Sequence, residues 1–92
     1  MENNTPARKL KELPKLPKKG KIYEMYGKQF SNNTMKINLN ALIEDFKTRS
    51  QMHVSTREVP KPVWIEWIKS FGFPENYEPD FELENQKTIF DK

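Results

Sequence analysis

The segment between Pro60 and Gly72 constrains the fold of this chain more than any other part of it. Pro60 and Pro62 stand at its start, and Gly72 directly follows its last apolar residue. Proline in the first turn of a helix and glycine just past the last turn are typical of helix ends. Such a helix carries four large apolar side chains on one face: Trp64, Trp67, Ile68 and Phe71. We therefore predict a helix over residues 63–71 that supplies much of the hydrophobic core.

The aromatic face of this helix has a second interpretation, because tryptophan is enriched at the centres of protein interfaces. On that interpretation Trp64, Trp67 and Phe71 form a partner-binding site. Core packing is the first expectation, since the chain has almost no core without these side chains. One of the two indoles remains a candidate for partial exposure.

A second helix and a β-hairpin are predicted earlier in the chain. Asn40 is a suitable N-cap for a helix that runs to about Arg49, with apolar residues at helical spacing. Residues 34–39 alternate between polar and apolar side chains, and a turn signal at 31–33 separates them from the apolar residues of 22–26. This pattern predicts a hairpin or short strand pair over 21–39. A helix over 21–30 is the competing interpretation, because Tyr23, Tyr26 and Phe30 also share a helical face.

The predicted architecture is a small α+β domain over residues 21–73. Residues 51–59 are expected to form a loop with a short strand at 52–54. An extended basic arm over 1–20 precedes the domain, and an acidic, irregular or weakly extended tail over 74–92 follows it. The 92-residue chain has no cysteine, so no disulfide reinforces a core that should contribute only about 3–5 kcal/mol of net stability. That composition fits a reducing compartment. With no signal-peptide or membrane-span pattern we expect a cytoplasmic protein, or a nuclear one if the host has a nucleus.

Charge is segregated along the chain. Residues 1–36 contain nine lysines and arginines and three acids, for a net +6. Residues 37–69 contain five and four, for +1, and residues 70–92 contain two and six, for −4. These values add to the net charge of +3. A basic front and an acidic end in so short a chain indicate a charged partner, with the acidic tail as a possible competitor for the basic arm.

The basic arm is the strongest functional signal. Seven cations and a single acid lie between Arg8 and Lys21, and Pro14 and Pro17 exclude a continuous helix there. The arm could dock on an apolar surface only through three leucines, Leu10, Leu13 and Leu16. Clustered cations suit a phosphate backbone, because each neutralised phosphate releases counterions. The candidate nucleic-acid-binding residues, from the arm and the domain together, are Arg8, Lys9, Lys11, Lys15, Lys18, Lys19, Lys21, Lys28, Lys36, Arg49 and Arg57.

Two alternatives use the same arm differently. Residues 13–19 match the proline-rich pattern that SH3 domains bind in the polyproline conformation. An acidic or grooved protein surface would also attract seven cations. A protein-binding inhibitor, adaptor or assembly component is therefore the alternative to a nucleic-acid-associated accessory or regulatory protein. Both hypotheses leave DNA and RNA undistinguished.

Catalytic machinery is not recognisable in the sequence. His53 is the only histidine, and no nucleophile motif, glycine-rich phosphate loop or metal-ligand cluster accompanies it. Asp80, Glu82 and Glu84 would share one face of a strand, which predicts a solvated acidic face more than a cation site. We expect no enzyme activity, no cofactor, no metal, no small-molecule substrate and no membrane association.

Overall fold

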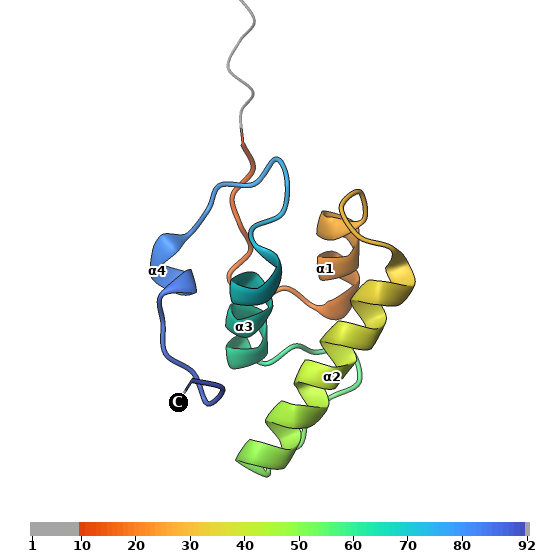
Figure 1. The fold of residues 1–92 in the computed structure, drawn as a ribbon, viewed down its shortest axis with the longest axis vertical. Coiled ribbons are helices and arrows are strands. Elements are labelled where there is room, and N and C mark those ends of the chain that lie inside the picture. The colour runs from red at the N-terminus through yellow and green to blue at the C-terminus, as the bar shows by residue number, and fades with distance from the viewer. Residues whose placement is uncertain (1–9, 92) are drawn as a thin grey trace, which may run out of the picture.

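A computed structural model of the chain describes residues 10–91 and consists of four helices (Figure 1). They are α1 (Lys19–Tyr26), α2 (Asn32–Ser50), α3 (Lys61–Phe71) and α4 (Phe81–Glu84). The helix α3 is central: it packs against α2 and α4, and α1 packs against α2. In Figure 1, α1 and α4 lie on opposite sides of α3, and α2 crosses below. β-pairing within residues 10–91 is limited to one isolated parallel bridge, between Lys11 and Tyr77.

The predicted α+β fold with a hairpin over 21–39 is wrong, because both halves of that segment are helical. In α1, Ile22, Met25 and Tyr26 are buried at the spacing of one helical face. The competing interpretation, a helix in this region, is the one that the structure has, although the helix ends before Gly27.

The second half of the predicted hairpin is the first half of α2. Met35 and Leu39 are four residues apart, a spacing that fits both a strand face and a helix face. Ile37 distinguishes the two, because its side chain is 61% exposed while Met35 and Leu39 are buried. The turn signal at 31–33 is in fact a helix start, where the Ser31 hydroxyl accepts a hydrogen bond from the Thr34 amide at 3.2 Å. Asn40, predicted as the N-cap, lies inside the helix.

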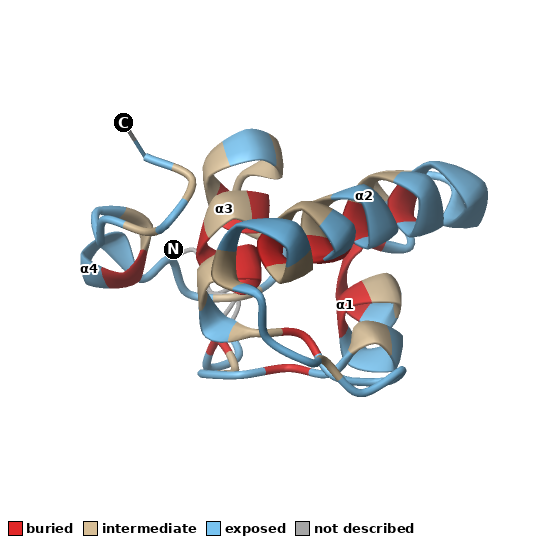
Figure 2. Ribbon diagram, turned by 90° about the horizontal axis from the view of Figure 1, so that it is seen from below, coloured by how far each residue is buried: buried red, intermediate tan, exposed pale blue. Residues whose placement is uncertain are grey.

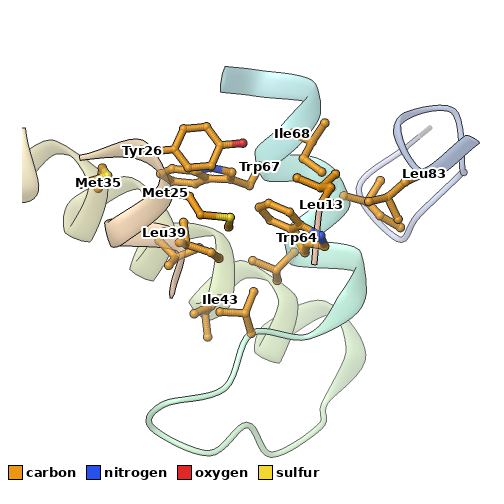
Figure 3. Packing of buried hydrophobic residues seen from close by; sticks show 14 of the residues in the cluster. Leu13, Met25, Tyr26, Met35, Leu39, Ile43, Trp64, Trp67, Ile68 and Leu83 are labelled. Carbon is orange, nitrogen blue, oxygen red and sulfur yellow. The ribbon is translucent and has the colours of Figure 1, made fainter. Parts of the chain in front are cut away.

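The helix predicted over 63–71 is confirmed, with two further residues at its start. It carries the largest part of the core, in which Val63, Trp64, Trp67 and Ile68 have no exposed surface. Figure 2 shows that buried residues line α3 and the facing side of α2. Figure 3 shows the two indoles among Met25, Tyr26 and Leu39. The Tyr26 hydroxyl donates to the Gly72 carbonyl at 2.6 Å, which fixes α1 to the end of α3.

Parts of the predicted arm and tail belong to the same core. Leu13 is only 7% exposed, and it lies between α3 and Leu83 of α4 (Figure 3). The Lys11 amide donates to the Asn76 carbonyl at 2.9 Å, and the Glu78 amide donates to the Lys11 carbonyl at 2.8 Å. The tail is also not irregular throughout, because Asp80 caps α4 by accepting from the Leu83 amide at 3.0 Å. The strand predicted at 52–54 is not formed, because these residues have no regular secondary structure and no strand pairing.

Two glycines of this fold should respond oppositely to the same substitution. Gly72 has φ 82° and ψ −177°, a region that is essentially restricted to glycine, whereas Gly20 lies in α1. An added Cβ meets nothing within 4 Å at either position, so only the backbone conformation differs. We expect Gly72→Ala to destabilise the fold by about 1–3 kcal/mol. Gly20→Ala should stabilise it by up to about 0.5–1 kcal/mol. Urea denaturation followed by circular dichroism measures both, and shifts of the same sign would contradict the assignment.

Candidate partner-binding surface

The described part of the basic segment, residues 10–18, lies on the domain with its lysines directed outward. Its apolar contacts are made by Leu13 and Pro17, which are buried. Lys11, Lys15 and Lys18 in the same stretch are all exposed. We call the exposed lysines of this stretch, together with Lys21 of α1, the basic ridge. The segment is anchored through one side and presents cations on the other.

Three lysines gather at one end of the ridge, around Tyr77. The Nζ atoms of Lys11 and Lys21 lie 5.8 and 6.0 Å from the centre of the Tyr77 ring. Lys11 and Lys28 also line a hollow of about 220 Å³ that includes Tyr77. Lys21 donates to Glu24 at 2.9 Å, a bond that raises the pKa of Lys21 and lowers that of Glu24. Two acids, Glu24 and Glu75, line the hollow as well, so this end of the ridge is of mixed charge.

The other end of the ridge meets the loop between α2 and α3. The Lys19 amide donates to the Arg57 carbonyl at 3.2 Å, which places Arg57 beside the start of α1. The Lys19 ammonium donates to the Asn40 side chain at 3.1 Å and is half-buried, so it contributes to packing of α1 on α2. Lys18 and Arg57 are exposed. The fold therefore brings together cations that are 39 positions apart in the sequence.

The remaining candidate cations are not part of this cluster. Lys36 is exposed near the start of α2. Arg49 in the last turn of α2 pairs with Asp45 at 2.9 Å, and its guanidinium lies 5.8 Å from the Phe90 ring centre. Lys36 and Arg49 are 13 positions apart in one helix, a distance of about 20 Å along its axis. Arg8 and Lys9 lie outside the described residues.

The aromatic candidates form core and not surface. Trp64 and Trp67 have 0% exposed area, so neither indole is accessible to a partner in this conformation. Phe71 is half-buried and packs on Phe30 and Trp67, with ring centres 5.3 and 4.3 Å apart. The proline-rich pattern at 13–19 is also not free to bind an SH3 domain in this conformation, because two of its apolar residues, Leu13 and Pro17, are buried against the protein's own core.

Sequence reasoning missed Tyr77 as a neighbour of the ridge. Tyr77 lies in the acidic part of the chain and is brought there by the bridge to Lys11. No sequence pattern within either segment predicts a single bridge between residues 66 positions apart. The exposed apolar side chains of Leu16 and Met52 were also not singled out as a pair, although both are 59% exposed.

The other chemistry-bearing residues are dispersed. Within residues 10–91 no three side chains of the kinds that bind metals gather at one place. The acidic residues near α4 include Asp80, which serves as a helix cap, and Phe81 beside it is 62% exposed. His53 is exposed. None of the helices in the described range has the length and apolarity needed to cross a bilayer.

Comparison of the chain with known protein families, with curated proteins and with solved structures gave no match.

Proposed function

We propose that the protein is a non-enzymatic, nucleic-acid-associated factor of the cytoplasm that contacts the phosphate backbone through its basic ridge. The observation that carries this proposal is the docking of the basic segment. Leu13 and Pro17 hold the segment against the core, while Lys11, Lys15 and Lys18 remain exposed. A segment that is already ordered loses less conformational entropy on binding than a free tail does.

The charge of the ridge and its surroundings supports the same proposal. Residues 10–28 contain six lysines and two glutamates, a net charge of +4. Within the described residues, Lys21 is the one ridge lysine with an ion-pair partner. Unpaired ammonium groups are available to replace the counterions of a phosphate backbone. Arg57 extends this surface beyond the segment itself.

The chemistry of the ridge favours backbone contact over base recognition. Lysine is a point charge that attracts phosphate without the bidentate geometry by which arginine reads guanine. Phosphate contacts fix position and orientation, but they carry no direct sequence information. We therefore expect DNA and RNA of different sequences to bind with similar affinities.

Salt titration of two double variants tests the proposal. Fluorescence anisotropy with labelled DNA and RNA should show wild-type affinity falling by about 2.7 decades between about 50 and 200 mM salt, if about five phosphates are contacted. Lys15→Gln/Lys18→Gln should reduce the slope of log K against log salt by about 1.8 on duplex DNA. Lys47→Gln/Lys87→Gln removes the same charge away from the ridge and should leave the slope unchanged. Absence of binding at the lowest salt, or equal losses in both variants, would refute the proposal.

A further inference from the structure

The loop between α2 and α3 forms an apolar groove with the docked segment. Six large apolar side chains in the described part of the chain are well exposed, and two of them, Leu16 and Met52, line this groove. Each is 59% exposed, although the two come from distant parts of the sequence. Exposure of two large apolar side chains in one groove distinguishes it from the scattered apolar residues of an ordinary surface.

The groove has a volume of about 480 Å³ and is lined by five parts of the chain. The lining consists of Leu16, Phe46 of α2, residues 52–55, residues 58–60 and the first turn of α3. Val54, Val59, Pro60 and Pro62 make the lining predominantly apolar. A nucleic-acid backbone has no apolar group to place there, so the groove fits a different kind of ligand from that of the ridge.

One cation lines this groove, and two more lie in neighbouring residues. Lys61 lines it, and Lys18 lies beside Leu16 in an adjoining hollow that also includes Glu58 and Val59. Arg57, in the same loop, is exposed. Within the described residues none of these three cations has an ion-pair partner, and Glu58 is the one acid in the lining. The charge complementary to this rim is negative.

The start of α3 adds to the same preference. This 11-residue helix begins at the groove with no side-chain cap and no acid in its first turn. Its positive dipole end therefore has no negative side chain from its own first turn or N-cap. The dipole supports the preference for an acidic ligand that the three cations already indicate.

The backbone along one wall favours an extended ligand. Of the amides in residues 52–54, that of Met52 donates to the Ser50 hydroxyl at 3.3 Å, while those of His53 and Val54 make no hydrogen bond to another described residue. An extended peptide that pairs with such a segment satisfies these groups and places alternate side chains toward the groove.

We infer that this groove binds a short, extended, acidic segment of a partner protein. Apolar side chains of that segment enter between Leu16 and Met52, and its carboxylates face Lys18, Arg57 and Lys61. The chain's own acidic–apolar segment is a poor substitute, because Leu83 is buried and residues 81–84 are helical. The occupant is thus a different protein and not a second copy.

Selection from a library of random twelve-residue peptides on the full chain tests this inference. Enriched peptides should combine acidic residues with apolar residues at alternate positions. Their binding should shift the backbone NMR signals of residues 16 and 52–62. Leu16→Gln/Met52→Gln should weaken peptide binding at least about tenfold. Ile37→Gln, which changes a 61% exposed residue on α2, should leave the affinity for the peptides unchanged.

Three results would overturn the inference. One is enrichment of basic or uncharged peptides, or no enrichment. Another is a set of shifted signals away from the groove. The third is self-association, in sedimentation, that Leu16→Gln/Met52→Gln abolishes, because the occupant would then be a second copy. Because these substitutions change no charge, the Leu16→Gln/Met52→Gln variant should bind DNA with the affinity and salt dependence of wild type. Failure of the peptide-binding inference is therefore distinguishable from failure of the phosphate-backbone proposal.

Discussion

Trp67→Ala should abolish the cooperative fold at 25 °C. The indole has no exposed surface and lies between Tyr26 and Phe71, with ring centres 5.6 and 4.3 Å away. Truncation of a buried tryptophan to alanine costs about 3–5 kcal/mol, because apolar transfer energy is lost and a cavity remains. A small core without disulfides supplies about the same total, so the variant should be largely unfolded.

Urea denaturation followed by circular dichroism measures this effect, with loss of helical signal at zero urea as the expected result. Phe81→Ala is the matched control, since it truncates an aromatic ring that is 62% exposed and contacts Phe73 at 5.8 Å. That contact contributes about 0.5–1.5 kcal/mol, so the control should unfold cooperatively. A cooperative transition for Trp67→Ala within about 1 kcal/mol of wild type would show that the core is not organised around this ring.

The protein should lose stability steeply above pH 10 because of Tyr26. Burial raises the pKa of Tyr26 above its usual range, and the neighbouring indole of Trp67 offsets this only in part. The folded state therefore retains a proton that the unfolded state releases above about pH 10. The contribution of the protonated Tyr26 to the free energy of unfolding is fully present below that pH. It falls by up to about 1.4 kcal/mol for each pH unit above it.

Tyr26→Phe separates this titration from the general effects of alkali. The variant loses the hydrogen bond to the Gly72 carbonyl and should be less stable at pH 7 by about 0.5–1.5 kcal/mol. Its stability should then fall less steeply than that of wild type between pH 10 and 12. Tyr77→Phe retains the Tyr26 phenol and should keep the wild-type slope. Parallel pH profiles for wild type and Tyr26→Phe would mean that the buried phenol does not control alkaline unfolding.

The central helix was predictable because its signals agree. Proline at the start, glycine after the end and a continuous aromatic face all indicate the same residues, and the structure has α3 at Lys61–Phe71. The helix α2 was predicted in its second half alone, since Asn38, Asn40 and Thr34 are weak helix formers. Tertiary burial of Met35 and Leu39 against the rest of the core overrides that local preference.

The candidate surface was predictable in its composition but not in its geometry. Charge segregation identified the lysines of the ridge, and their exposure follows from the cost of burying a charge. Three leucines were equivalent as docking residues in the sequence, yet only Leu13 is buried, while Leu10 and Leu16 are 40% and 59% exposed. That choice depends on where α3 and α4 leave space, which no pattern within the segment encodes.

The pairing of Lys11 with residues 76–78 has a consequence for the order of folding. It joins positions 66 apart, so the entropic cost of closing that loop is met only once α3 and the turn after it are in place. The contacts of α1 with α2 and of α2 with α3 span shorter stretches and should form earlier. We therefore expect the Lys11 end of the ridge to form late and to open early, with early amide exchange at Lys11 and Glu78 as its signature. A nascent or partly unfolded chain would carry the same lysines without their ordered arrangement. A partner that needs this arrangement would therefore bind only the fully folded protein.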